Sequence, residues 1–197
     1  MINLDHSGRF VVIVGPSGAG KDTLIDYARE HLADDNTIHF VRRVITRPVS
    51  VGEDHDPVTS DMFEERVGRA AFALHWDAHG LRYGLPGIID DWLEQRHVVV
   101  ANGSRAVLPE ARRRYGSLLR VINVSASPNV LAERLEKRGR EGYDGRRARI
   151  ARTAQIHVDL SDALDIDNSG ELSIAGQALV TVLRRVTQLR GQSQSKG

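Results

Sequence analysis

The segment from Arg9 to His31 constrains the fold of this chain more than any other. Its first part, Arg-Phe-Val-Val-Ile-Val at 9–14, is β-branched or apolar at nearly every position, which is typical of a strand buried on both faces of a parallel sheet. Gly15 ends this run, and from 22 to 31 the apolar residues recur at helical spacing. The order of strand, Gly-rich turn and helix predicts a βα unit whose turn binds phosphate.

The turn reads Gly-Pro-Ser-Gly-Ala-Gly-Lys-Asp-Thr at 15–23 and matches the phosphate-binding loop pattern through its lysine. Glycines let backbone N–H groups turn inward around phosphate oxygens, and the N-terminus of the following helix adds the positive end of its dipole. Lys21 is expected to reach the β and γ oxygens of a nucleotide. We therefore predict ATP as a cofactor, bound by Gly15, Pro16, Ser17, Gly18, Ala19, Gly20, Lys21, Asp22 and Thr23.

Asp22 stands where the usual pattern has Ser or Thr, and Thr23 comes one position later. Because Mg²⁺ prefers oxygen ligands and keeps several waters, Asp22 or Thr23 is predicted to hold this ion directly or through water. The plainer interpretation of Asp22 is a negative charge in the first turn of a helix, where it favours the helix dipole. The sequence leaves both interpretations open.

Length and composition bound the class of protein. A chain of 197 residues with 41% hydrophobic residues fits one domain, 1–197. Its 27 basic and 26 acidic residues give no case for binding nucleic acid or acidic membranes. The absence of cysteine fits a reducing compartment, and neither a bilayer-spanning run of about 20 apolar residues nor a signal peptide is present. We expect a cytoplasmic protein.

The rest of the chain repeats the alternation of strand and helix. Further strands are predicted at 97–101, 118–124 and 163–167, and a final amphipathic helix at 174–189. This alternation indicates an α/β sheet. Residues 43–84 have short or mixed periodicity and are predicted to form an insertion between core strands. The tail at 191–197 is expected to be disordered.

Several motifs between residues 9 and 168 resemble the guanylate kinase branch of the nucleoside monophosphate kinases. They are the phosphate loop at 15–21, Ile-Thr-Arg-Pro at 45–48, Gly-Leu-Arg-Tyr-Gly at 80–84 and Arg-Leu-Glu-Lys-Arg-Gly-Arg at 134–140. The resemblance implies a guanylate kinase-like P-loop NTPase fold, an α/β three-layer fold with a parallel central sheet. It also implies a core at about 8–42 and 85–190, an acceptor-binding lobe at about 43–84 and a lid at about 138–150.

The lobe departs from guanylate kinases where they read guanine. They typically carry Phe-Leu-Glu-Trp, whose glutamate contacts the base, whereas this chain has Phe-Ala-Leu-His-Trp at 72–76. The second arginine before their Gly-Glu pair is absent at 50–53, and their acidic run after a strand is replaced by Asn-Gly-Ser-Arg at 102–105. A lobe that keeps Arg47 and Arg82, gains Arg105 and lacks base-reading acids suits an acceptor that has phosphate at both ends and no base.

These departures resemble the ribose 1,5-bisphosphate phosphokinase family. The resemblance implies ATP-dependent phosphorylation of ribose 1,5-bisphosphate to 5-phospho-α-D-ribosyl 1-diphosphate, in the route that recovers phosphorus from phosphonates. Lys21, Arg138 and Arg149 are the predicted catalytic residues. The predicted substrate-binding residues are Arg47, Asp77, Tyr83, Asn102, Ser104 and Arg105. Asn168 approaches adenine by analogy with the family, or forms a turn before Ser169-Gly170.

Two other functions are weighed against this one. A guanylate or other nucleoside monophosphate kinase would share the loop and the lobe but would need another way to recognise a base. A guanylate-kinase-like protein-interaction module would share the fold, but such modules tend to lose the phosphate loop that this chain keeps. For the predicted kinase, the sequence is compatible with a homodimer.

Overall fold

The fold is described from a computed structural model for residues 8–48, 54–78, 80–137 and 158–189. The predicted lid at 138–150 and the predicted disordered tail at 191–197 lie outside these residues.

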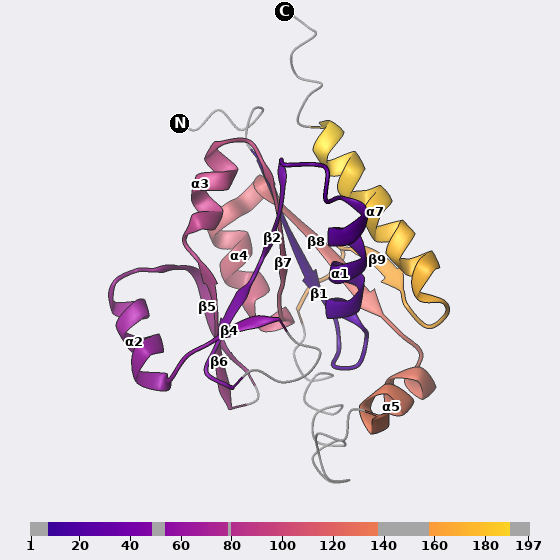
Figure 1. Ribbon diagram of the computed structural model, residues 1–197, viewed down its shortest axis with the longest axis horizontal. Coiled ribbons are helices and arrows are strands. Elements are labelled where there is room, and N and C mark those ends of the chain that lie inside the picture. The colour runs from indigo at the N-terminus through magenta and orange to yellow at the C-terminus, as the bar shows by residue number, and fades with distance from the viewer. Residues whose placement is uncertain (1–7, 49–53, 79, 138–157, 190–197) are drawn as a thin grey trace, which may run out of the picture.

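Five parallel strands form the main sheet in the order β2-β7-β1-β8-β9 (Figure 1). They are β1 (Arg9–Val14), β2 (Ile38–Val41), β7 (Val98–Asn102), β8 (Leu119–Ser125) and β9 (Leu164–Asp167). Strand β1 is central, since Val12 pairs with Ala101 of β7 and with Val121 of β8. Its residues 10–14 are fully buried, which explains why its sequence is apolar without alternation.

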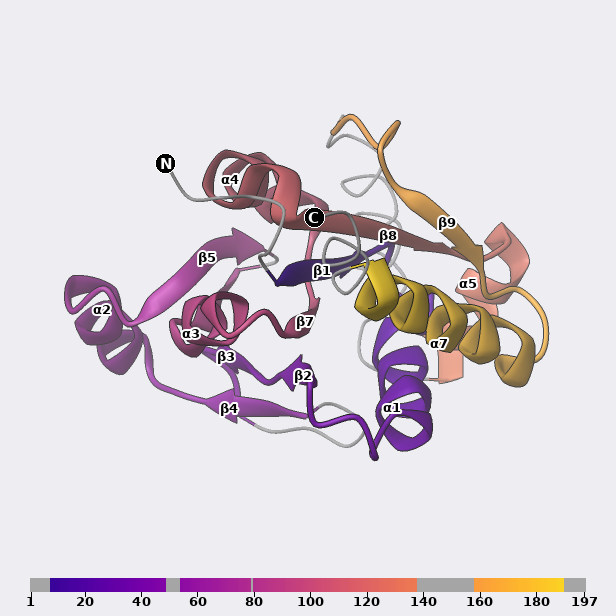
Figure 2. The same ribbon diagram turned by 90° about the horizontal axis from the view of Figure 1, so that it is seen from above.

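Helices cover both faces of this sheet. Phe10, Val12 and Val14 share one core with α3 (Ile88–Glu94) and α4 (Leu108–Tyr115). Val11 and Ile13 face the other core, with α1 (Lys21–His31) and α7 (Leu172–Leu189). Figure 2 shows these two pairs of helices on opposite sides of β1. The predicted three-layer α/β fold with a parallel central sheet is thereby confirmed.

A second, smaller sheet carries the segment predicted to be the acceptor-binding lobe. Its strands are β3 (Arg43–Ile45), β4 (His55–Pro57), β5 (Phe72–Ala78) and β6 (Leu81–Pro86), in the order β4-β3-β6-β5. Helix α2 (Ser60–Gly68) packs on this sheet through Phe63, whose ring stacks on Phe72 at 4.7 Å between centroids. Leu74 and Trp76 of β5 belong to the core that α3 and α4 share. The lobe is therefore joined to the main sheet by apolar packing.

The remaining elements follow β7 and β8 at their carboxyl ends or connect α4 to β8. They are α5 (Pro128–Lys137) and the 3₁₀ turns η2 (Arg105–Val107) and η3 (Gly116–Leu118). The strands predicted after β1 and the final helix are present with ends shifted by one or two residues. Strand β2 and helix α3 were not predicted, and the seven residues of α3 are too few to show a clear helical period. Among the described residues, no helix has both the length and the apolar content needed to cross a bilayer.

Candidate active site

The loop between β1 and α1 is held in a conformation that depends on glycine. Gly15 and Gly20 have φ angles of 152° and 85°, in the region that side chains rarely adopt. A Cβ atom on Gly15 would lie 2.1 Å from the carbonyl oxygen of Val124, and one on Gly20 would lie 2.5 Å from Asn168 Nδ2. The chain therefore needs glycine at both positions, where the loop passes against β8 and against the residue that follows β9.

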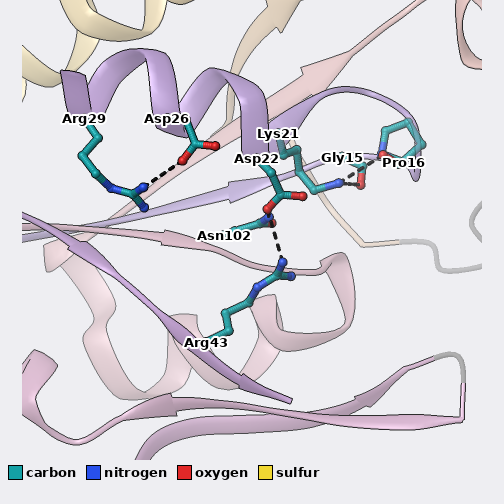
Figure 3. Close-up of polar contacts among 8 residues, drawn as sticks. All are labelled: Gly15, Pro16, Lys21, Asp22, Asp26, Arg29, Arg43 and Asn102. Carbon is teal, nitrogen blue, oxygen red and sulfur yellow. Dashed lines mark hydrogen bonds and ion pairs between the residues drawn. The ribbon is translucent and has the colours of Figure 1, made fainter. Parts of the chain in front are cut away.

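Lys21 is the first residue of α1 and its ammonium group folds back over the loop. The Nζ atom donates to the carbonyl oxygens of Gly15, at 2.9 Å, and of Pro16, at 3.1 Å (Figure 3). The ammonium group thus lies at the N-terminus of a helix, beside backbone that can bind an anion. This is the position expected of the lysine in a phosphate-binding loop.

Asp22 connects this loop to the lobe and to β7. Its Oδ1 atom accepts hydrogen bonds from Asn102 Nδ2, at 2.5 Å, and from Arg43 Nη2, at 3.3 Å (Figure 3). The Asp22 and Arg43 side chains are 26% and 12% exposed. Three residues from α1, β3 and β7 therefore meet at the carboxyl end of the main sheet, where ligands bind in open α/β sheets. Thr23 is exposed on α1 and makes none of these contacts.

The oxygen atoms of Asp22 and Asn102 fit a magnesium ion. Asp22 offers a carboxylate, and the Oδ1 atom of Asn102 is buried without a hydrogen-bond partner among the described residues. Carboxylate and amide oxygens are the ligand types that Mg²⁺ takes, together with waters and nucleotide phosphates. Asp22 and Asn102 are accordingly the residues that would hold the ion.

Two lobe residues predicted to bind substrate have defined surroundings. The Tyr83 ring stacks on Trp76, with centroids 5.4 Å apart, and the Arg43 guanidinium lies 5.9 Å from the centre of the Tyr83 ring. The backbone carbonyl of Arg47 accepts a hydrogen bond of 3.0 Å from Nε2 of His55, which is fully buried. Tyr83 thus joins the group around Asp22 through Arg43, while Arg47 is fixed by β4.

The other predicted substrate-binding residues lie in two regions. Ser104 caps η2, since its hydroxyl oxygen accepts from the Ala106 N–H at 3.2 Å. Arg105 follows it and donates to Asn123 Oδ1 on β8 at 3.3 Å, while its Nε atom is buried without a partner among the described residues. Asp77 is separate from this region, because its side chain is 79% exposed and pairs with Arg82 at 3.2 Å. No contact within the described segments connects Asp77 to the phosphate loop.

Sequence reasoning did not assign a site role to Arg43, His55 or Arg134. Arg134 of α5 donates to the carbonyl oxygen of Asn168 at 2.9 Å and reaches those of Gly18 and Ala19. Asn168, for which the sequence left an adenine contact or a turn open, is 2% exposed and donates to the Ala19 carbonyl at 2.8 Å. The available sequence signal for Arg134 was that it is a charged residue in the motif at 134–140, which had been matched to the family. Arg138 and Arg149, the predicted catalytic arginines, lie outside the described residues.

The first strand of the chain lies in the centre of a parallel sheet and is followed by a Gly-rich loop and a helix that begins with lysine. This arrangement defines the class of P-loop nucleotide-binding proteins. A family model described as an AAA domain matches residues 11–156. Among solved structures, guanylate kinase from Anaplasma phagocytophilum is similar with a TM-score of 0.68 and 17% identity, over 97% of this chain and 96% of that one. A gluconokinase from Sinorhizobium meliloti 1021 follows with a TM-score of 0.52 and 19% identity, over 96% and 98%. The fold is therefore guanylate kinase-like.

Sequence comparison narrows the class to one family. A protein of Thiobacillus denitrificans named ribose 1,5-bisphosphate phosphokinase PhnN is 49% identical over 177 residues, which are 89% of this chain and 93% of the relative. Proteins with the same name from Brucella melitensis and Agrobacterium fabrum are 48% and 46% identical, over 91% and 93% of this chain and 93% and 99% of theirs. The chain belongs to the ribose 1,5-bisphosphate phosphokinase family.

Proposed function

We propose that this protein transfers the γ-phosphoryl group of ATP to the 1-phosphate of ribose 1,5-bisphosphate and forms 5-phospho-α-D-ribosyl 1-diphosphate. The observation that carries the proposal is the composition of the site: a phosphate loop faces a lobe that offers arginines in place of base-reading acids. His75, at the position of the glutamate that reads guanine, is exposed on β5. The name shared by the relatives gives the same acceptor.

In the proposed reaction, an oxygen of the acceptor 1-phosphate attacks the γ-phosphorus in line. A new oxygen–phosphorus bond forms, the bond between the γ-phosphorus and the bridging β,γ-oxygen breaks, and ADP leaves with that oxygen. Because the attacking oxygen is already anionic, no general base has to remove a proton. Catalysis then depends on positioning and on stabilising negative charge.

Lys21 and the loop backbone supply part of that stabilisation. We infer that the ammonium group leaves the carbonyl oxygens of Gly15 and Pro16 and binds the β and γ oxygens when ATP enters. Mg²⁺ held by Asp22 and Asn102 would neutralise phosphate charge in the same place. Arg138 and Arg149 remain predictions for the lid side, where they would contact the transferring group.

The acceptor is proposed to lie between the lobe and the end of β7. Arg47 and Arg105 are assigned to its phosphates, because planar guanidinium groups bind phosphate oxygens in pairs. Tyr83 and Ser104 carry hydroxyl groups for its oxygens, and Asp77 remains the predicted partner of a ribose hydroxyl. The exposed position of Asp77 beside Arg82 means that this last contact requires the acceptor to reach the outer end of β5.

The acceptor can be tested by ³¹P NMR of the purified protein with Mg·ATP and, in separate tubes, ribose 1,5-bisphosphate, GMP or ribose 5-phosphate. A new diphosphate signal with ribose 1,5-bisphosphate alone is the expected result. Turnover of GMP instead would show that the lobe recognises a base, and the proposed acceptor would be wrong. Absence of turnover in every tube would contradict a phosphotransferase function.

Lys21→Met tests the assigned chemistry in the same assay. Because groups that stabilise developing charge usually contribute about 10²-fold or more, kcat should fall by at least that factor while the fold is retained. Lys137→Met is the matched control, since Lys137 pairs with Glu133 on the exposed surface of α5. Activity of Lys21→Met within about threefold of the parent would contradict the assignment.

A further inference from the structure

A carboxylate directly after the lysine of a phosphate loop creates an electrostatic problem. Asp22 is the second residue of α1, so its charge lies close to the backbone and the ammonium group that bind nucleotide phosphates. Two anions at such a distance repel each other unless a cation stands between them, and the partly buried position strengthens the repulsion. Once the nucleotide binds, Asp22 therefore needs a cation between its carboxylate and the phosphates.

In the structure, the cation beside Asp22 is Arg43. The Arg43 side chain is only 12% exposed and its guanidinium carbon lies 5.9 Å from the centre of the Tyr83 ring, so its charge also requires an opposite charge. The distance of 3.3 Å from Nη2 to Asp22 Oδ1 is longer than the 2.7–2.9 Å usual for a charge-assisted hydrogen bond, and a single pair of atoms is involved. The ion pair is therefore loosely made, which is expected of a contact that can be exchanged.

The two partners also come from different parts of the molecule. Arg43 begins β3, the first strand of the lobe, whereas Asp22 belongs to the helix that carries the phosphate loop. Figure 3 shows the Arg43 side chain extending from its strand toward Asp22 and Asn102. The pair therefore connects the acceptor lobe to the nucleotide site at the residue that fits Mg²⁺.

We propose that Asp22 exchanges Arg43 for the nucleotide-bound Mg²⁺ and that the released Arg43 binds a phosphate of the acceptor. This inference rests on the proposed function. Once the cation occupies the Asp22 carboxylate, the guanidinium group loses its partner and is available to an anion in the lobe. Nucleotide and acceptor then bind with positive coupling, and by linkage each raises the affinity for the other by the same factor.

Equilibrium dialysis of ribose 1,5-bisphosphate tests the coupling without turnover. Its dissociation constant is measured for the whole chain alone and with Mg²⁺ and a non-hydrolysable ATP analogue. In the parent protein the nucleotide should tighten binding by about tenfold, within the range usual for coupled sites. Arg43→Met should bind weakly in both conditions and show no coupling, and Arg43→Lys should fall between Arg43→Met and the parent.

Asp22→Asn gives the decisive contrast, because it should have the opposite effect. With no carboxylate to hold it, Arg43 is free for the acceptor before nucleotide binds, so acceptor affinity without nucleotide should rise toward the coupled value of the parent. Asp26 and Arg29 form the matched control pair one turn further along α1, at 2.8 Å and well exposed (Figure 3). Asp26→Asn and Arg29→Met should leave both affinities and the coupling unchanged.

The outcomes separate this inference from the proposed function. If Arg43→Met keeps the coupling, or if Asp22→Asn does not tighten acceptor binding without nucleotide, the exchange of partners is wrong while the proposed acceptor stands. If the same change in acceptor affinity appears in Asp26→Asn, the effect comes from removing any negative charge from α1, and the proposed exchange of partners is again wrong. Failure of the parent protein to bind ribose 1,5-bisphosphate in either condition would overturn the proposed function together with this inference.

Discussion

At the scale of single residues, the charged groups of the site are held in place by hydrogen bonds and by one ion pair. The Lys21 ammonium group is bound by two carbonyl oxygens of its own loop, and the Asp22 carboxylate is bound by Arg43 and Asn102. In a nucleotide complex, the Lys21 ammonium group and the Asp22 carboxylate would each have a different binding partner. In the proposed complex, nucleotide binding would replace these polar contacts with new ones made by groups that are already close together.

His55 is a residue whose function is indirect. It is fully buried in β4, and its Nε2 atom must carry the hydrogen because its partner is the carbonyl oxygen of Arg47, at 3.0 Å. The carbonyl of His55 in turn accepts a hydrogen bond of 3.1 Å from Arg42 Nη2. His55 is therefore a positioning residue that fixes the backbone on which the Arg47 side chain stands.

The residue-scale prediction concerns the hydrogen bond between His55 and the Arg47 carbonyl. His55→Leu should raise KM for ribose 1,5-bisphosphate by about tenfold, because a lost hydrogen bond to a buried carbonyl costs about 1–3 kcal/mol and loosens Arg47. KM for ATP should stay near the parent value. His55→Gln, whose amide nitrogen can occupy the place of Nε2, should restore much of the acceptor affinity. Steady-state kinetics with each substrate varied in turn measures all of these values, and an unchanged acceptor KM in His55→Leu would contradict the assignment.

At the scale of elements, helix α5 and the phosphate loop support each other. None of the α5 side chains is fully buried, yet the helix lies over the loop: a Cβ atom on Gly18 would meet Leu135 Cγ at 3.3 Å and the Leu131 carbonyl oxygen at 3.4 Å. Arg134 adds hydrogen bonds to loop carbonyls and to Asn168, which itself holds Ala19. The loop is thus clamped between α5 and the residue that follows β9.

Removing this clamp should weaken nucleotide binding. Arg134→Met is expected to raise the dissociation constant for Mg·ATP by about tenfold, because hydrogen bonds from a charged group contribute about 1.5–3 kcal/mol and the loop loses its preorganisation. Amide hydrogens of α5 should exchange faster, since the helix has little buried apolar surface to hold it. Isothermal titration calorimetry and hydrogen exchange measure the two effects.

The control for Arg134→Met is Lys137→Met on the same helix. Lys137 pairs only with Glu133 among the described residues, and the Lys137 side chain is 75% exposed. Its replacement should leave nucleotide affinity and amide exchange of α5 unchanged. Equal effects of the two substitutions would mean that helix propensity, and not the contact with the loop, accounts for the change.

At the scale of the whole molecule, the edge of the main sheet contains a pair of histidines. His39 of β2 lies 2.7 Å from His97, measured from Nε2 to Nδ1, and its ring stacks on Trp92 of α3 at 4.2 Å between centroids. Partial burial, followed by the charge of His97, lowers the pKa of His39 below its ordinary value of 6.5. The folded protein therefore favours neutral His39, whereas the unfolded chain accepts a proton more readily.

This difference predicts how stability depends on pH. As the pH falls from about 7.5 to about 5.5, the unfolded chain binds more protons at this site than the folded protein, so the unfolding free energy should decrease. Once the pH lies below the folded-state pKa, the contribution of His39 becomes constant. His39→Phe, which keeps an aromatic ring on Trp92, should show a smaller decrease over this range.

Urea unfolding at several pH values measures the effect. His31→Phe is the matched control, because His31 also stacks on an aromatic ring, that of Tyr27 at 3.9 Å, but is exposed and has no histidine partner among the described residues. Its pH dependence should equal that of the parent. If His39→Phe retains the full decrease, the histidine pair does not cause it.

The sequence by itself determined the parts of this protein that depend on neighbouring residues. The apolar run at 9–14, the glycines and Lys21 are contiguous, so their pattern was sufficient to predict a buried strand, a phosphate loop and a helix. The residue types of the lobe likewise indicated the absence of a base reader. These are local features, because backbone conformation and the period of side chains follow from short stretches of chain.

Only the tertiary structure decided which distant side chains meet. Asn102 contacts Asp22 across 80 positions because β7 lies beside β1, and Asn168 reaches Ala19 across 149 positions because the chain returns past β8 to β9. In the sequence, Arg43 is one of two adjacent arginines, and only the position of β3 shows that its side chain reaches Asp22. The order of strands in a sheet is fixed by the packing of both faces and not by any one segment, and for that reason the contact between Asp22 and Arg43 could not be predicted from the sequence.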